Sequence, residues 1–227
     1  KIITIGGGDP FNYDWIFEVI VFSKEKGLFV HIDSNMILLN ETDINKRILN
    51  ENVDLIGIPL DASNSRTHDL VRNKKGHYNL IKSKIDWLSF MVDRLKINTF
   101  VNSKNIDNLD LLSDDILSIN PRIWSLYQYC SVYHNDDMIS KYYVNDQSFN
   151  HQTSKIIDKL NRTSIDLELT YSTKRVKKYP IVSSDGIAEI LVEKDKPYLI
   201  LGSIFIPSTM DKIKENCFDS NNERYIL

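Results

Sequence analysis

Three groups of glycine and polar residues each follow a short apolar run early in the chain. They are Gly6-Gly7-Gly8-Asp9-Pro10, His31-Ile32-Asp33-Ser34-Asn35 and Gly57-Ile58-Pro59-Leu60-Asp61. Glycine lets a backbone approach a ligand closely, and an aspartate beside it can pair with a cation. Ligands of α/β proteins bind where strands end. The pattern therefore favours a binding site at successive strand ends, although three glycines alone more often form a tight turn.

His31 and Asp33 fall on the same face of their predicted strand, where they could form a metal or acid–base pair. Two ligands are too few for a metal site, so a core pair or a solvated pair is the better interpretation. No phosphate-binding loop ending in Gly-Lys-Ser and no Gly-x-Gly-x-x-Gly motif is present.

The run 95–102 places Lys96, Asn98, Phe100 and Asn102 on one face and apolar residues with Thr99 on the other. A strand covered on both sides is normally apolar on both. A lysine and two asparagines on one face therefore suggest the polar interior of a ligand-binding barrel. An edge strand with one wetted face explains the pattern equally well.

A basic segment, Arg72-Asn73-Lys74-Lys75-Gly76, precedes a predicted helix. Lysine and arginine gather where phosphate is bound, but a run of charges is usually a solvated surface, and the second interpretation is the default.

Strand-like and helix-like segments alternate along the chain, which predicts parallel βαβ units. Strands are expected at 2–5, 28–32, 53–60, 95–101 and 122–130, helices at 14–26, 42–50, 78–94, 109–118 and 145–160, and further short strands at 165–170, 181–184, 187–192 and 198–201. The expected fold class is α/β: a partial (β/α) barrel of parallel strands with a β-rich C-terminal extension. The C-terminal strands either pack on the barrel or are its last strands. The expected domains are a barrel core at 1–133, lacking its first strand, and a barrel-closing helix with the extension at 134–227. Periodicity alone allows an open doubly wound sheet as well.

The composition suits a globular domain: 227 residues, 42% hydrophobic, with a formal net charge of −3. That charge argues against general nucleic-acid binding, and no apolar run is long enough to span a membrane. The two cysteines, Cys130 and Cys217, form neither a disulfide framework nor a metal motif, which indicates a reducing, cytoplasmic location. Because Lys1 opens directly into a strand, we expect a longer protein cut at its N-terminus.

Taken together, these segments resemble the radical S-adenosylmethionine (radical SAM) superfamily. Gly7-Gly8-Asp9 resembles the Gly-Gly-Glu motif that ends the family's second barrel strand, and Ser34-Asn35-Met36 resembles a Ser-Asn-Gly sequence that ends the third. The segment Asp54–Asp61 resembles the fourth strand, and His68-Asp69 with Arg72 resembles the segment after that strand. The resemblance implies that S-adenosylmethionine (AdoMet) is held by Gly7, Gly8, Asp9, Ser34, Asn35 and Arg72.

Within that superfamily the chain resembles the viperin-like group. The basic segment Arg72–Lys75, the strand Arg94–Asn98 and the strand Trp124–Gln128 carry this resemblance. It implies dehydration of CTP or UTP at the ribose, with Lys75, Lys96 and Asn98 on the substrate. Asp9 in place of glutamate, Met36 in place of glycine and Pro59 in place of serine depart from the pattern.

The resemblance also implies a [4Fe–4S] cluster, whose three-cysteine loop would lie upstream of Lys1, and an electron donor such as flavodoxin or ferredoxin. The full-length protein would then generate a 5′-deoxyadenosyl radical as a lyase, and this piece alone would be inactive. Three alternatives stay open. They are a radical SAM enzyme acting on a peptide or another small molecule, a cluster-less nucleotide-binding barrel, and an unrelated doubly wound protein.

Overall fold

A computed structural model describes residues 1–130, 136–172, 180–183, 185–192 and 198–216. They form two compact units, the first made of Lys1–Gln128 with Val144–Leu169 and the second of Tyr129–Tyr143 with Thr170–Leu227. The predicted domain boundary between residues 133 and 134 lies outside the described residues and stays a prediction.

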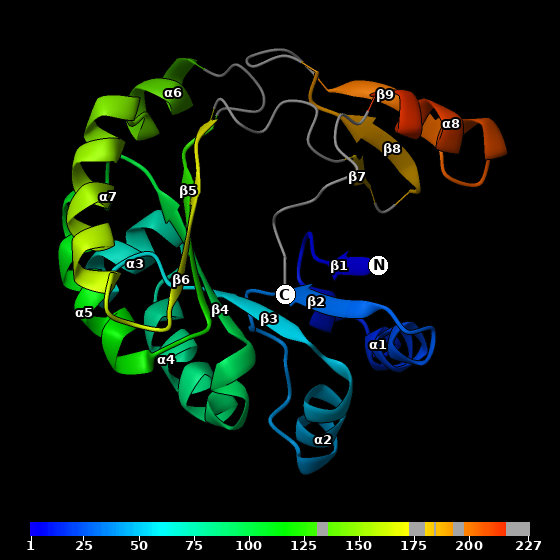
Figure 1. The fold of residues 1–227 in the computed structure, drawn as a ribbon, viewed down its shortest axis with the longest axis horizontal. Coiled ribbons are helices and arrows are strands. Elements are labelled where there is room, and N and C mark those ends of the chain that lie inside the picture. The colour runs from blue at the N-terminus through cyan, green and yellow to red at the C-terminus, as the bar shows by residue number, and fades with distance from the viewer. Residues whose placement is uncertain (131–135, 173–179, 184, 193–197, 217–227) are drawn as a thin grey trace. The chain divides into compact units, whose positions relative to one another are not determined.

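The first unit is built on one six-stranded sheet in which the strands lie side by side in chain order (Figure 1). The strands are β1 (Ile2–Ile5), β2 (Phe29–Asp33), β3 (Leu55–Pro59), β4 (Leu95–Val101), β5 (Ile123–Gln128) and β6 (Asp166–Thr170). Each of the first four strands pairs in parallel with the next. Sequential parallel order confirms the predicted partial barrel. It excludes the doubly wound alternative, whose strand order reverses part-way across the sheet.

Helices connect the strands, as parallel pairing requires. Those of the first unit are α1 (Ile16–Glu25), α2 (Asp43–Asn52), α3 (Ser65–Arg72), α4 (His77–Trp87), α5 (Leu109–Ile119) and α7 (Asp146–Leu160), with 3₁₀ turns at Pro10–Asn12, Leu88–Arg94 and Ile106–Asn108. In the part of the chain that the structure describes, no helix is long and apolar enough to cross a membrane.

The helical region expected at 78–94 is shorter than predicted. Helix α4 ends at Trp87, and a 3₁₀ segment with a non-helical residue, Met91, continues to Arg94. Helix α3 was not predicted, although both of its ends are marked in the sequence. The Asn64 side chain accepts from the Thr67 N–H at its start, and Asn73 adopts a left-handed conformation at its end.

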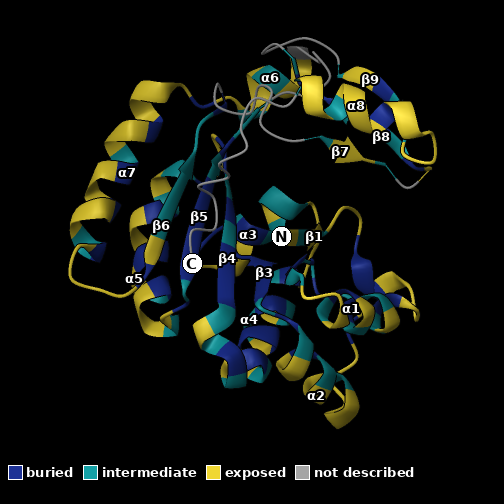
Figure 2. Cartoon of the chain, turned by 45° about the vertical axis from the view of Figure 1, so that its right-hand side comes forward, coloured by how far each residue is buried: buried dark blue, intermediate teal, exposed yellow. Residues whose placement is uncertain are grey.

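One face of the sheet is an apolar core that packs against the helices. Ile58, Ile97 and Trp124 are neighbours in the register and are all completely buried. Figure 2 shows β3, β4 and β5 largely in the colour of buried residues. Since β4 lies between β3 and β5, the edge-strand interpretation of residues 95–102 is wrong, and its polar face is interior.

The second unit contains a three-stranded antiparallel sheet, which confirms the β-rich C-terminal extension. Its elements are α6 (Asp136–Tyr142), β7 (Ile181–Val182), β8 (Ile187–Ile190), β9 (Leu199–Ser203) and α8 (Pro207–Asn216). A small core of Ala188, Ile190 and Leu201 packs with Val192 and Ile213. The predicted strand 165–170 does not belong to this sheet, because it forms β6 of the barrel.

Trp124 anchors the apolar face, so we expect Trp124→Ala to lower the free energy of unfolding by about 3–5 kcal/mol. The substitution removes the largest fully buried side chain and the hydrogen bond from its Nε1 to the Thr99 hydroxyl (2.9 Å). Urea unfolding followed by circular dichroism measures the loss. Trp15→Ala is the control, because Trp15 is 54% exposed, and should cost less than about 1 kcal/mol. Equal losses in the two variants would contradict this account of the core.

Candidate functional site

Asp9 lies in the turn after β1, behind Gly6, Gly7 and Gly8, and is almost completely buried. Its Oδ1 accepts a hydrogen bond from the Ser34 hydroxyl (2.6 Å), while its Oδ2 is buried and has no partner among the described residues. Gly7 and Gly8 precede it with φ values of +79° and +53°, and nothing lies within 4 Å of the position that a side chain would take at either. A buried hydrogen-bond acceptor therefore lies next to two glycines that have free space where a side chain would be.

The loop after β2 holds Asp9 in place. Ser34 donates its backbone N–H to the Gly57 carbonyl (3.0 Å), and its hydroxyl accepts from the Met36 N–H (2.9 Å) while donating to Asp9. Met36 is completely buried at φ +62°. Since the Ser34 hydroxyl has donor and acceptor roles filled within the protein, Ser34 acts mainly by orienting Asp9.

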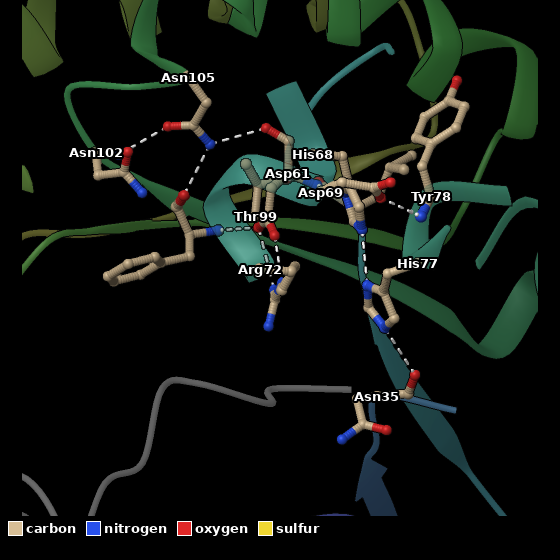
Figure 3. A network of polar contacts seen from close by, with 12 residues as sticks. Asn35, Asp61, His68, Asp69, Arg72, His77, Tyr78, Thr99, Asn102 and Asn105 are labelled. Atoms are coloured by element: carbon tan, nitrogen blue, oxygen red, sulfur yellow. Dashed lines mark hydrogen bonds and ion pairs between the residues drawn. The ribbon is translucent and has the colours of Figure 1, made fainter. Parts of the chain in front are cut away.

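Asp61, after β3, is completely buried and organises a second polar network (Figure 3). Arg72 donates to both of its carboxylate oxygens through Nε and Nη2, and the Phe100 N–H donates to Oδ1 at 2.8 Å. The Asn105 side chain donates to the Asp61 carbonyl at 2.8 Å. One edge of the Arg72 guanidinium, formed by Nε and Nη2, is therefore committed to Asp61, and a ligand could meet the edge formed by Nη1 and Nη2.

Two buried histidines link this network to the loop after β2 (Figure 3). The Asp61 N–H donates to His68 Nδ1 (3.0 Å), His68 Nε2 lies 2.9 Å from His77 Nδ1, and His77 Nε2 lies 3.2 Å from the Asn35 carbonyl. A backbone N–H can only donate, so His68 Nδ1 must accept and Nε2 carries the proton. The Asn35 carbonyl can only accept, so His77 carries its proton on Nε2 and accepts from His68 through Nδ1. The chain of bonds needs both imidazoles neutral, and burial lowers the pKa of His68 to about 4 and also lowers that of His77.

The face of the sheet opposite the apolar core carries a row of polar groups. Asp33, Gly57 and Lys96 are register neighbours on β2, β3 and β4. The Asn98 amide donates to Asp33 Oδ1 at 2.6 Å, passing over Gly57. A side chain at Gly57 would put its Cβ 1.9 Å from Asp33 Oδ1 and 2.7 Å from Asn98 Nδ2. Only glycine on β3 allows this contact.

Lys96 is completely buried and paired with a carboxylate of the same barrel. Its Nζ lies 2.7 Å from Glu168 Oε2 on β6, and the Ser125 hydroxyl donates to the same oxygen. A buried ammonium requires such a partner, because its desolvation is otherwise very costly. The two charges cancel within the row.

Asp33 is the more accessible acid, with its side chain 37% exposed. His31 Nε2 lies 3.3 Å from its Oδ1, and His31 Nδ1 lies 3.2 Å from the Thr4 hydroxyl. Burial opposes ionisation, but the hydrogen bond and charge of His31, the charge of Lys96 and the Asn98 amide outweigh it. The pKa of Asp33 consequently lies below its ordinary value, and its carboxylate is ionised at neutral pH.

The structure joins some of the residues expected from the sequence and separates others. Asp9 and Ser34 touch, and Arg72 is connected to the Asn35 carbonyl through Asp61 and the two histidines. Asn98 and Lys96 share the interior row. Lys75 is exposed in the turn between α3 and α4, whereas Lys96 is buried in an ion pair with Glu168, and the assignment of Lys75, Lys96 and Asn98 to a substrate stays a prediction.

Sequence reasoning placed Gly57 and Asp61 in a strand-end group and His68 in the resemblance without giving any of them a role. It did not name His77 or Glu168. A glycine inside a strand is a usable signal for a close approach, and Gly57 carried it. Glu168 carried no such signal, because the sequence does not show that this carboxylate lies opposite Lys96 in the folded barrel.

No group of three or more histidine, cysteine or acidic side chains that could hold a metal occurs within the described ranges. Cys130 is a free thiol, and Cys217 lies outside those ranges. The described residues therefore offer no ligand set for an iron–sulfur cluster.

Comparison with known proteins shows what the chain is similar to. Residues 1–102, somewhat less than half of the chain, match the family model described as the radical SAM superfamily. The chain is 26% identical over 108 residues to the AdoMet-dependent heme synthase of Methanosarcina barkeri, a match that covers 48% of this chain and 31% of that protein.

Solved structures share the fold at low identity. A structure of anSMEcpe with bound AdoMet is 14% identical, with a TM-score of 0.68 over 95% of this chain and 66% of that one. Streptococcus suis SuiB bound to precursor peptide SuiA is 14% identical, with a TM-score of 0.61 over 75% and 38%. The chain thus spans about a third of the length of the heme synthase and of SuiB. The comparisons do not point to the viperin-like group.

The residues around Asp9 fit AdoMet. The buried Asp9 Oδ2 has no hydrogen-bond donor among the described residues, and the amino group of AdoMet is a cationic donor. The absence of side chains at Gly7 and Gly8 leaves space beside that oxygen.

We expect Gly57→Ala to lower the free energy of unfolding by about 1–3 kcal/mol, because its methyl group overlaps Asp33 Oδ1. Gly6→Ala is the matched control, since a Cβ there lies 3.4 Å from the Asp33 Cβ and the Gly6 φ is not positive. Urea unfolding compares the two variants. If Gly57→Ala is as stable as Gly6→Ala, the Asp33–Asn98 contact does not constrain the sheet.

Stability should fall as the pH drops from 7.5 to 5.5. The unfolded chain protonates His68 near its ordinary pKa of 6.5, whereas the folded chain does so only near 4, so acid favours unfolding between these values. The contribution of His68 at pH 5.5 is about 1.4 kcal/mol. His68→Asn retains an acceptor for the Asp61 N–H but does not titrate, so its free energy of unfolding should depend less on pH. The exposed His151→Asn serves as control, and an unchanged pH slope in His68→Asn would refute the neutral histidine chain.

Proposed function

We propose that this chain is the barrel portion of a radical SAM enzyme, which binds AdoMet at the Gly7-Gly8-Asp9 turn. The observation that carries the proposal is the buried Asp9 carboxylate, with one oxygen fixed by Ser34 and the other without a partner among the described residues. The domain match over residues 1–102 and the fold shared with AdoMet-bound structures support it. When bound, AdoMet and a [4Fe–4S] cluster that receives one electron from a donor protein would supply radical chemistry for removal of a hydrogen atom from a substrate.

The residues of this chain bind and orient. Asp9 Oδ2 accepts from the amino group of AdoMet, and Gly7 and Gly8 let the ligand approach the backbone. Ser34 fixes Asp9, and the histidine chain fixes the Asn35 loop. The exposed edge of Arg72 is the proposed partner for the AdoMet carboxylate. The interior row on β2, β3 and β4 faces the substrate.

Peptide substrates are the class that the structural comparisons favour. The solved relatives include SuiB bound to its precursor peptide and anSMEcpe bound to peptides. Dehydration of CTP or UTP by a viperin-like lyase rests on the sequence resemblance alone. It would require the buried Lys96 to leave Glu168 in order to bind phosphate.

The proposal predicts that the chain binds AdoMet and that Asp9→Asn weakens the binding about tenfold, as expected for loss of a charged hydrogen bond. The asparagine can still accept from Ser34, so the turn is retained. Isothermal titration calorimetry with AdoMet measures the affinity without requiring catalysis.

Asp93→Asn removes an equal charge from a side chain that is 79% exposed, and its affinity should match that of the parent chain. Absence of AdoMet binding in the parent chain, or equal binding by Asp9→Asn, would overturn the proposed function.

A further inference from the structure

The two carboxylates of the barrel interior differ in their partners. Lys96 is neutralised by Glu168 at 2.7 Å, which leaves Asp33 as an ionised carboxylate in contact with the Asn98 amide and the His31 imidazole. It is also the most exposed of the row's charged groups, at 37% against 23% for Glu168 and 0% for Lys96. A ligand in the barrel would therefore meet the Asp33 carboxylate, whereas Lys96 is already paired with Glu168.

Asn98 adds a second acceptor beside Asp33. A carboxylate only accepts, so the contact between Asp33 Oδ1 and Asn98 must use the Nδ2 end of the amide, which fixes the amide's orientation. Its Oδ1 is then buried without a partner within the described part of the chain. A buried acceptor that lacks a donor costs free energy, and a ligand donor would remove that cost.

We propose that Asp33 and Asn98 form a substrate-recognition site for a cationic N–H donor, such as the ammonium group of a lysine side chain. This inference rests on the proposed function, because it assigns the substrate class of the same barrel. One ammonium has donors enough for both Asp33 and the free Asn98 Oδ1. A phosphate, in contrast, is repelled by Asp33 and Glu168 and finds the Lys96 ammonium already bound.

Gly57 makes the site possible. Without a side chain on β3, Asp33 and Asn98 meet from strands on either side of it, and both acceptors are held by a rigid sheet. Groups placed on strands keep their geometry better than groups placed on loops, which favours recognition of one donor in one position.

The probe is Nα-acetyl-lysine amide, titrated into the ¹⁵N-labelled 227-residue chain at pH 8. Nα-acetyl-norleucine amide, which lacks only the ammonium group, is the matched ligand. The backbone amide of Gly57 and the side-chain amide of Asn98 report binding by nuclear magnetic resonance. The lysine probe should shift both signals, the norleucine probe should shift neither, and Asp33→Asn should weaken binding of the lysine probe about tenfold or more.

Asp33→Asn keeps an acceptor for Asn98, and Asp93→Asn controls for the lost charge. Equal binding of the two probes to the parent chain overturns the inference whether or not the variant folds. So does binding of uridine triphosphate that shifts the same signals and is lost in Lys96→Met. Titration of AdoMet into the parent chain tests the proposed function separately, so failure of one can be told from failure of the other.

Discussion

The parallel register of β2, β3 and β4 sets Asp33, Gly57 and Lys96 side by side, and the interior of the barrel follows from that alignment. Hydrogen bonds between the backbones fix which side chains are neighbours, so polar groups in this row must satisfy one another or remain unpaired. The glycine opens space for an aspartate–asparagine contact, and the lysine draws a carboxylate from β6. A shift of one residue in any of these strands would turn the row toward the apolar core, where it would have no partners.

The end of β2 is the junction of three networks. Asp33 belongs to the interior row, Ser34 holds Asp9, and the Asn35 carbonyl accepts from His77. Because these residues are consecutive, the proposed substrate site and the proposed AdoMet site are supported by the same short segment. Rigid hydrogen bonds on each of the three residues suit a site that must hold two ligands in a fixed relation.

Much of the fold could be predicted from the sequence, because strand–helix alternation and the apolar runs are local signals. Strands β1 and β4 were expected at their observed bounds, and the polar face of 95–102 correctly indicated an interior. The role of strand 165–170 could not be read locally. Membership of a sheet depends on which edge remains open after the other strands pair. Strand β6 lies next to β5 in the sheet, although α6 and α7 lie between them in the sequence.

Lys96 shows why the site was harder to predict than the fold. A lysine on an interior face implies that an anion lies nearby, and the sequence suggested that the anion was a substrate phosphate. A buried ammonium needs a partner even when no substrate is bound, however, because its desolvation cost is present whenever the chain is folded. The protein must supply the anion itself, and Glu168 does so from 72 residues away. The accessible charge in the barrel is then that of Asp33. The ligand that we propose is therefore a cation instead of the anionic phosphate that the sequence suggested.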